Sequence, residues 1–472
     1  MQFATYVDPI AQRYASQAMS ELFSPLERAR TWRRLWIALA ESEHELGLPI
    51  SSEQLDELRS AADQIDLARV AEHEARLRHD VMAHIHAFGE VAPGARGILH
   101  LGATSCFVTD NADLLIIREG MEIISQRLLR MIHGLSRFAR EHATTPTLGL
   151  THLQPAQLTT VGKRAALWIQ DLVDVWEGLT QLSGRLPFRG VKGTTGTQAS
   201  FLQLFDGDAS KVQELERRLA EKMGFTQVVA LTGQTYSRSW DYRVLSVLSE
   251  LAIALHKFST DLRLAQSWGE LEEPYGSSQI GSSAMPYKRN PMKAERLGSL
   301  AKLLQGIAPG MANVAATQWM ERTLDDSAFR RVGLAQGFLC ADSMLIIGRN
   351  IADGLRLQPV VAERRVMDNL PFLAAEELLM HGVSAGGDRQ DLHERIRQLS
   401  WKATEEIRAG RPNPLRALLE EDSVLAPFLE QLPPWDPQRF IGLAPQQTLA
   451  YLDDVVAKLP QPVDDDVSEL SV

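Results

Sequence analysis

The sequence predicts an all-α fold of three helical domains with a long central helical bundle. The first observation is an apolar stripe whose spacings alternate between three and four residues from position 114 to 138. It covers about four heptads, which corresponds to a helix on the order of 40 Å long. The second is that long stretches with helical periodicity recur from 106 to about 357. The third is that the periods are shorter on both sides of this region.

We expect the domain boundaries where the period changes. Residues 1–105 form an N-terminal helical domain of short and medium helices, including one over 31–46 and one capped by Ser51, with Gln54 three residues later. Residues 106–357 form the central long-helix bundle. Residues 358–472 form a C-terminal helical domain in which prolines return, and it ends in an acidic tail that we expect to be disordered.

The central bundle is expected to contain four more long helices. They are predicted at 155–186, 242–271, 291–320 (kinked near Pro309) and 329–355. Helices of this length cannot bury their apolar stripes alone, so they should pack together, with the remaining apolar faces packing between subunits. A monomeric helical repeat protein is the alternative, but the sequence has no fixed period of 20 to 50 residues.

Charge and cysteine content limit the function. The chain has 472 residues and a formal net charge of −11, which argues against a general nucleic-acid binder. An anionic small substrate remains compatible, because a few cations can reverse the field inside a cleft. The two cysteines, Cys106 and Cys340, cannot form a disulfide framework and fit a reducing cytosol. We find no signal peptide and no apolar run of membrane-spanning length, so we expect a cytoplasmic protein with no membrane partner.

One polar segment lies between two long amphipathic stretches. Residues 281–291 read Gly-Ser-Ser-Ala-Met-Pro-Tyr-Lys-Arg-Asn-Pro. Gly281 gives the backbone freedom, and Pro286 and Pro291 disfavour helix for the residues before them, so we predict a loop, with Pro291 opening the next helix. Polar loops on rigid helices often carry chemistry. An ordinary helix–helix connector is the alternative on composition alone.

Two other segments have compositions that can indicate ligand sites. The histidine-rich run at 78–86 lacks the HExxH spacing, because His79 and His84 are five apart and no histidine follows the preceding His73-Glu74 at the required position, so no metal is expected there. The glycine-rich segment 189–198 lacks the order of a phosphate-binding P-loop. We interpret it as a structured turn whose backbone could contact an anion.

Four further polar clusters occur, at 102–105, 151–155, 232–238 and 321–331. The first two are predicted to precede helices, where Thr104, Ser105 and Thr151 could simply be N-caps. His152 is not a favoured cap, but it can exchange a proton near neutral pH. The arginines of the last cluster lie between two apolar helices, which fits the binding of a carboxylate or phosphate.

Taken together, these segments resemble a known family. The loop is similar to the GSSxMPxKxNP signature of the fumarase/aspartase superfamily, continued by Glu295. Within it, the sequence resembles the adenylosuccinate lyase family at 151–164, 189–201, 231–238, 282–292 and 321–328. The resemblance runs from Arg13 to about Glu394 and is weakest in the last 70 or so residues.

The resemblance implies an all-α homotetramer whose sites are shared between three subunits. It implies cleavage of adenylosuccinate to AMP and fumarate, and of the succinylated carboxamide ribotide (SAICAR) to AICAR and fumarate, both steps of purine synthesis. It implies no metal and no organic cofactor.

The resemblance also implies residue roles. Ser282 is the expected base, with adjacent Ser283 as the alternative, and His152 is the expected acid that protonates the departing nitrogen. Glu295 would orient this histidine. The loop amides, Lys288 and Asn290 would stabilise the aci-carboxylate charge that develops. Phosphate and ribose contacts are implied for Arg13, Tyr14, Arg296, Arg322, Ser327 and Arg331, and further substrate contacts for Arg78, His79, Asp80, Thr104, Ser105 and Gln234.

Two alternatives remain. Another lyase of the superfamily, acting on argininosuccinate, malate or aspartate, would share the loop, but Lys288-Arg289-Asn290 and 321–331 fit a nucleotide substrate better. A non-catalytic helical scaffold would be expected to lose the acid or the base, but His152, Ser282, Lys288 and Glu295 are all present.

Overall fold

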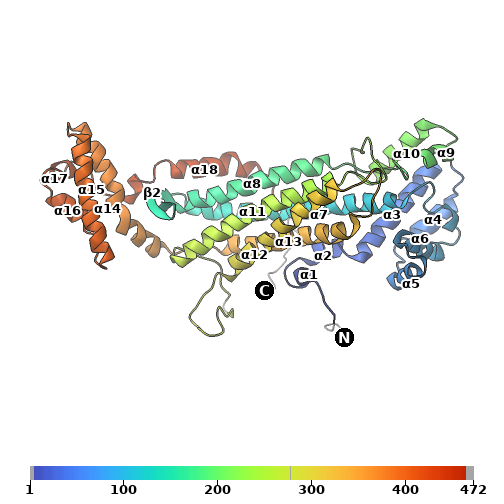
Figure 1. The fold of residues 1–472 in the computed structure, drawn as a ribbon, viewed down its shortest axis with the longest axis horizontal. Helices are drawn as coiled ribbons and strands as arrows, with labels where there is room; N and C mark the ends of the chain where they lie inside the picture. The colour runs from blue at the N-terminus through green and yellow to red at the C-terminus, as the bar shows by residue number, and fades with distance from the viewer. Residues whose placement is uncertain (1–4, 277, 464–472) are drawn as a thin grey trace.

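A computed structural model describes residues 5–276 and 278–463 as an elongated helical molecule (Figure 1). The all-α prediction is confirmed, since the strands of the described residues form only two small two-stranded sheets. Five long helices lie along the molecule. They are α7 (Ser105–Glu141), α8 (Val161–Arg185), α11 (Ser239–Ser267), α12 (Met292–Ala316) and α13 (Ser327–Gly354).

The predicted apolar stripe forms the buried face of α7. All eight of its positions from Leu114 to Phe138 are buried in the central core. The helix has 37 residues and is therefore about 55 Å long, longer than predicted because it begins nine residues before the stripe. It packs closely on α13, where a Cβ on Gly120 would lie 2.8 Å from the ring of Phe338. α13 is long and apolar enough to cross a membrane, but 72% of its most apolar window is buried inside the protein, so it is a core helix.

The predicted helix at 155–186 is wrong in its first turns. Residues 146–160 form a hairpin of β1 (Pro146–Thr151) and β2 (Gln154–Thr160), and α8 begins only at Val161. Leu148 pairs with Leu158 in this hairpin, and both are buried against α14 (Pro359–Ser384). This packing stabilises an extended backbone. Pro155 is tolerated because proline can occupy an edge strand, and both strands of a two-stranded sheet are edge strands. Thr160 caps α8 by accepting the N–H of Lys163 at 3.0 Å.

The other long helices agree with prediction to within a few residues. α12 contains Pro309, and Pro291 is its N-cap rather than its first helical residue. The loop predicted at 281–291 is confirmed as non-helical. Just before it, β3 (Leu271–Glu272) pairs antiparallel with β4 (Arg356–Leu357).

The N-terminal end consists of shorter helices. These are α1 (Pro9–Arg13), α2 (Gln17–Leu22), α3 (Pro25–Glu45), α4 (Ser52–Ser60), α5 (Leu67–Leu77) and α6 (Asp80–Val91), followed by the 3₁₀ turn η1 (Arg96–Ile98). The capping box predicted for Ser51 and Gln54 is present at the start of α4. Two further helices, α9 (Ala199–Leu204) and α10 (Ala209–Lys222), lie at this end (Figure 1).

The C-terminal end has its own small apolar core. It is built by α14, α15 (Arg389–Arg408), α16 (Leu415–Glu421) and α17 (Ala426–Leu429). After η2 (Pro437–Arg439), α18 (Ala444–Asp454) lies alongside α8, and with η3 (Val456–Lys458) it contributes Leu452 and Val456 to the central core (Figure 1). The predicted acidic tail at 464–472 lies outside the described residues.

The connections determine which polar segments meet. Successive long helices run in opposite directions (Figure 1). The start of α7, the segment before α11 and the α12–α13 connection therefore share the N-terminal end of the bundle. The hairpin and the loop before α12 lie at the other end, near α14.

Candidate active site

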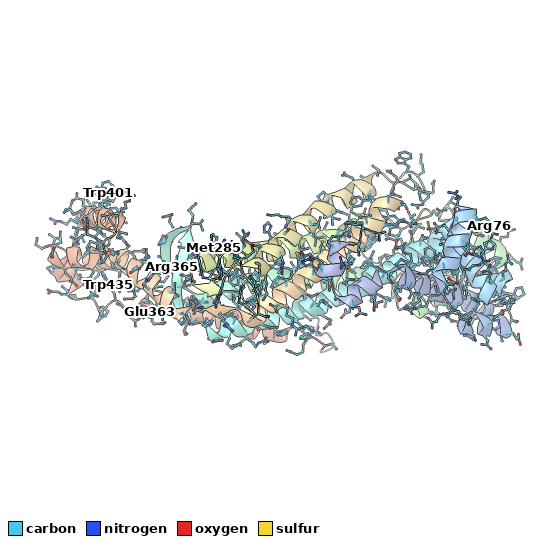
Figure 2. The ribbon with its side chains drawn as sticks, turned by 90° about the horizontal axis from the view of Figure 1, so that it is seen from below. Arg76, Met285, Glu363, Arg365, Trp401 and Trp435 are labelled. Carbon is cyan, nitrogen blue, oxygen red and sulfur yellow. The ribbon has the colours of Figure 1, made fainter. Side chains whose placement is uncertain are left out.

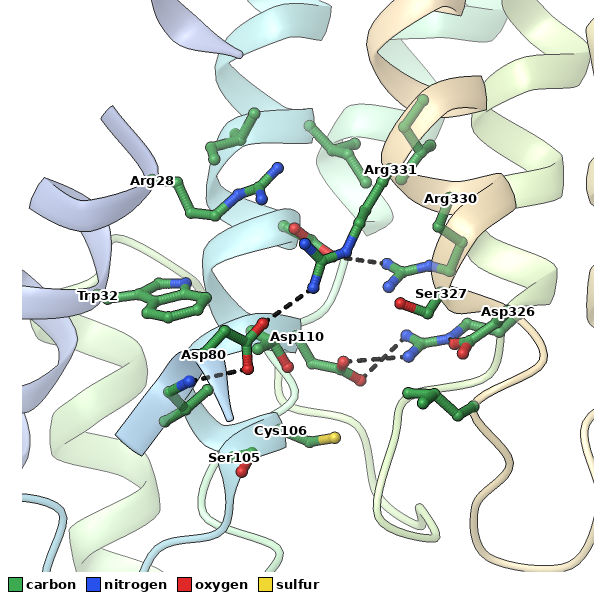
Figure 3. Close-up of a pocket in the computed structure, with 18 of the residues that line it drawn as sticks. Arg28, Trp32, Asp80, Ser105, Cys106, Asp110, Asp326, Ser327, Arg330 and Arg331 are labelled. Atoms are coloured by element: carbon green, nitrogen blue, oxygen red, sulfur yellow. Dashed lines mark hydrogen bonds and ion pairs between the residues drawn. The ribbon is translucent and has the colours of Figure 1, made fainter. Parts of the chain in front are cut away.

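A cavity of about 300 Å³ lies at the N-terminal end of the bundle (Figure 3). Its walls come from Phe23, which follows α2, from α3 and α6, from the first turns of α7 and α13, and from the segments before α11 and α13. Seven of the residues singled out from the sequence line it: His79, Asp80, Ser105, Gln234, Arg322, Ser327 and Arg331. The fold thus brings together polar segments that lie up to 252 positions apart, counted from residue 79 to residue 331.

Thr104 occupies the N-cap position of α7, but its hydroxyl does not cap the helix. The hydroxyl instead accepts a hydrogen bond from Gln234 Nε2 at 3.2 Å. The neighbouring Cys106 donates from Sγ to Gln234 Oε1 at 3.6 Å. The N-cap explanation left open for Thr104 therefore does not hold, and the two residues together orient the Gln234 amide.

A sharp turn between α5 and α6 positions the next group. Arg78 closes α5 with a left-handed backbone (φ 54°), and His79 is the N-cap of α6, its Nδ1 accepting from Met82 N at 3.3 Å. His79 Nε2 lies 3.4 Å from Ser105 Oγ. Asp80 forms an ion pair with Arg331, with 2.9 Å between the carboxylate oxygen and the guanidinium nitrogen (Figure 3).

Beneath the cavity lies a chain of charged residues whose pairing the sequence does not predict. Asp110 binds both terminal nitrogens of Arg238, at 3.0 and 3.1 Å. Arg238 Nε donates to Asp326 at 2.7 Å, and the other oxygen of Asp326 accepts from Arg322 at 2.9 Å. Burial alone would raise the pKa of Asp110, but the charges of Arg238 and Arg330 outweigh it, so this pKa is lowered.

A second buried network lies beside the first. Arg330 binds Asp241 at 2.7 Å and Asp113 at 2.9 Å, and it donates to the Tyr236 hydroxyl at 2.6 Å. Arg238 and Arg330 are buried in their ion pairs, whereas Arg322 and Arg331, which also pair with aspartates, lie farther out, with side chains 26% and 57% exposed. The sequence does not predict these buried ion pairs, because ion pairs between distant segments leave no local pattern in it.

The residues that the resemblance implies for proton transfer do not line this cavity. Ser282, Lys288 and Asn290 lie in the loop before α12, and Glu295 and Arg296 lie in the first turn of α12. Figure 2 shows Met285 of this loop toward the Arg365 end of the molecule and Arg76 of α5 at the opposite end. The 25 residues of α12 correspond to roughly 37 Å between this loop and the α12–α13 connection. One subunit alone does not bring the loop to its own cavity.

The loop has a defined internal structure. Asn290 Nδ2 donates to the carbonyl of Gly281 at 2.8 Å and so closes it. Ser282 Oγ accepts from Met285 N at 3.1 Å and from Ala284 N at 3.4 Å. Ser283 and Lys288 are exposed.

His152 lies at the tip of the β1–β2 hairpin and is exposed. It and Leu153 form a two-residue turn with φ of 52° and 58°, the pattern of a type I′ hairpin. The predicted placement of His152 before a helix is therefore wrong. Thr151 is the last residue of β1 and not a helix cap.

Arg13 and Tyr14 end α1, which packs on α13. Tyr14 packs against the central core, and the guanidinium of Arg13 lies 5.9 Å from its ring. Neither is among the residues that line the cavity. The described residues hold no group of three or more His, Cys, Asp or Glu side chains arranged for a metal ion.

Known proteins resemble this chain over its whole length. A lyase family model matches residues 26–306, and a model of the adenylosuccinate lyase C-terminus matches 371–450. The chain is 47% identical to adenylosuccinate lyase of Saccharomyces cerevisiae, covering 98% of this chain and 96% of the relative. It is 45% identical to that of Schistosoma mansoni, covering 96% of each. Among solved structures, 3-carboxy-cis,cis-muconate lactonizing enzyme from Pseudomonas putida is similar at 25% identity with a TM-score of 0.82, covering 94% of this chain and 98% of that one. The chain is a lyase that belongs to the adenylosuccinate lyase family of the fumarase/aspartase superfamily.

Proposed function

We propose that this lyase cleaves adenylosuccinate to AMP and fumarate, and SAICAR to AICAR and fumarate. The observation that carries the proposal is the cavity at the start of α13, where Arg322, Ser327 and Arg331 gather. A helix N-terminus with two arginines suits a phosphate group. Both substrates carry one, whereas malate, aspartate and argininosuccinate do not.

The reaction is a β-elimination. A base removes a proton from the succinyl carbon next to a carboxylate, and the charge spreads into that carboxylate as an aci-form. The C–N bond then breaks, its electrons go to the departing nitrogen, and an acid protonates that nitrogen. Both steps require donors placed in advance where charge develops.

We propose Ser282 as the base. Its oxygen already accepts two backbone N–H groups, and hydrogen bonds of this kind stabilise the alkoxide. Adjacent Ser283 is exposed, so these contacts favour Ser282 of the two. The loop amides and Lys288 would bind the aci-carboxylate, and His152 would act as the acid, oriented by Glu295.

We further propose a homotetramer with each site shared by three subunits. The distance between the loop and the cavity within one subunit supports this. So do apolar side chains exposed on the long helices: Leu167 (46%) on α8, Ile253 (57%) on α11 and Leu303 (46%) on α12. Such surfaces on bundle helices are typical of subunit contacts.

Turnover tests the activity directly. The full-length protein is incubated with adenylosuccinate, and the ultraviolet change is followed as AMP and fumarate form. We expect turnover with adenylosuccinate and none with argininosuccinate or malate. The reverse pattern would contradict the proposal, and no turnover with any of the three would favour a scaffold.

Complementation tests the shared site. Ser282→Ala and His152→Gln should each be inactive, since each removes one proton-transfer group. Unfolding the two variants together and refolding them as a mixture should restore part of the activity, because some sites would then contain an intact serine and an intact histidine. No recovery in a mixture that has formed tetramers would contradict a site shared in this way.

A further inference from the structure

The cavity contains an arginine that no described residue neutralises. Five arginines and four aspartates line it. Arg238, Arg322, Arg330 and Arg331 each form an ion pair with an aspartate. Arg28 of α3 also lines the cavity, and its side chain has neither a hydrogen bond nor an ion pair with a described residue.

The position of Arg28 on α3 directs it inward. Ser24, Arg28 and Trp32 are spaced four residues apart, so they share one face of the helix, and all three line the cavity. Figure 3 shows the guanidinium of Arg28 extending toward Arg331 across the space between α3 and α13. Arg28 is only half-buried, so a ligand can reach it.

The nearby carboxylate does not serve as its partner. The charge of Arg28 acts on Asp113, but Asp113 is bound to Arg330 at 2.9 Å. Burial raises the pKa of Asp113, and Arg330 and Arg28 lower it only in part. Arg28 therefore remains a positive charge that the cavity walls do not neutralise.

Trp32 gives a second indication that this wall is incomplete without a ligand. It is 3% exposed, and its indole nitrogen is buried with no acceptor among the described residues. A buried donor without a partner destabilises the protein, because it loses its hydrogen bond to water and gains none in return. An oxygen-rich group bound between α3 and α13 would supply an acceptor for it.

We propose that Arg28 is a further substrate-binding residue that contacts the nucleotide phosphate, opposite Arg331 and Ser327. This rests on the proposed function, since it takes a nucleotide as the ligand. A phosphate is favoured over a succinyl carboxylate because the facing wall is the N-terminus of α13, where backbone N–H groups and the helix dipole favour a phosphate. The surplus positive charge that Arg28 gives the cavity then matches an anionic ligand.

Binding of AMP and of adenosine, which lacks the phosphate, separates the contributions. Arg28→Gln should raise the Kd for AMP by roughly ten-fold to a hundred-fold, the range for a lost hydrogen bond to a charged group, and leave the Kd for adenosine unchanged. The KM for adenylosuccinate should rise while kcat falls much less. Arg28→Lys should recover part of the loss. Arg30→Gln is the matched control, because Arg30 is on the same helix with its side chain 47% exposed and is not among the residues that line the cavity.

Unchanged AMP binding in Arg28→Gln, with a melting temperature like that of the unmodified protein, would overturn the inference. An equal loss for AMP and adenosine would also overturn it, because the effect would then not involve the phosphate. If the unmodified protein fails to cleave adenylosuccinate but binds AMP through Arg28, the proposed function fails and this inference stands. The two failures are therefore distinguishable.

Discussion

Asp326 Oδ2 lies 2.7 Å from Arg238 Nε, although 88 positions separate the two residues. Asp110 fixes Arg238 from the other side, and the second oxygen of Asp326 holds Arg322 at 2.9 Å. Arg322 is partly exposed in the cavity, but its orientation is set by this buried chain. Asp326 is thus a positioning residue for Arg322, the arginine proposed to bind the substrate.

Replacing Asp326 by asparagine should therefore impair binding more than chemistry. The amide keeps the shape but loses the charge that attracts both arginines. We expect the KM for adenylosuccinate to rise by about ten-fold, the effect of roughly 1.4 kcal/mol, with a smaller change in kcat. Steady-state kinetics beside a melting curve measure this. The exposed neighbour Asp325 provides the control, and an equal effect of Asp325→Asn would show that no specific positioning is involved.

Glu273 serves as the cap of α12 from outside the helix. Pro291, the N-cap residue, makes no side-chain capping bond. The two oxygens of Glu273 instead accept Lys293 N at 3.0 Å and Ala294 N at 2.9 Å. The segment that begins at β3 thereby holds the turn that carries Glu295 and Arg296.

Glu273→Ala should lower both stability and turnover. The loss of a helix cap costs about 0.5 to 2 kcal/mol, and the freed first turn would no longer hold Glu295 in place. Glu273→Gln keeps one good acceptor and should lie between the alanine variant and the unmodified protein. The melting temperature and kcat measure the two effects. An alanine variant equal to the unmodified protein in both would show that the cap is unnecessary.

Gly281 allows the backbone of the loop before α12 to approach itself closely. A Cβ at this position would lie 2.2 Å from the carbonyl oxygen of Lys288 and 2.7 Å from the Tyr275 hydroxyl. Gly281→Ala should therefore displace the Lys288 backbone and weaken the bond from Asn290. We expect kcat to fall by at least ten-fold, about 1.4 kcal/mol in the barrier, with little change in melting temperature because most of the loop is exposed.

Gly306→Ala is the matched control for this loop prediction. Gly306 lies on α12, and an added Cβ there meets no atom within 4 Å. The substitution should be neutral or stabilise the helix by up to about 1 kcal/mol. Full activity in Gly281→Ala would mean that the loop does not need the closed form seen here.

How much the sequence predicts depends on the range of the interaction. The stripe on α7 and the capping box at Ser51 are local, and both are correctly predicted. The β1–β2 hairpin is not correctly predicted, because Pro155 suits the first turn of a helix as well as an edge strand. The extended conformation is stabilised by packing on α14, which is distant in the sequence. Asp110 and Asp326 bind Arg238 across 128 and 88 positions, respectively, so no local pattern predicts these two ion pairs.

Glu43 on α3 makes stability depend on pH. It is fully buried, and neither carboxylate oxygen has a hydrogen-bond partner among the described residues. Burial raises its pKa to about 9, so the folded protein keeps the proton at neutral pH while the unfolded chain releases it near pH 4.5.

The stabilising effect of the bound proton is complete below pH 4.5 and is lost as the pH rises toward 9. The slope cannot exceed about 1.4 kcal/mol per pH unit for one proton. Glu43→Gln is neutral throughout, so its free energy of unfolding relative to the unmodified protein should increase steadily from pH 5.5 to 8.5. Urea unfolding at a fixed protein concentration measures this, with Glu45→Gln, a more exposed position two residues on, as control. Parallel pH profiles for the unmodified protein and Glu43→Gln would mean that Glu43 is already ionised in the folded state, in which case a cation or water must reach it.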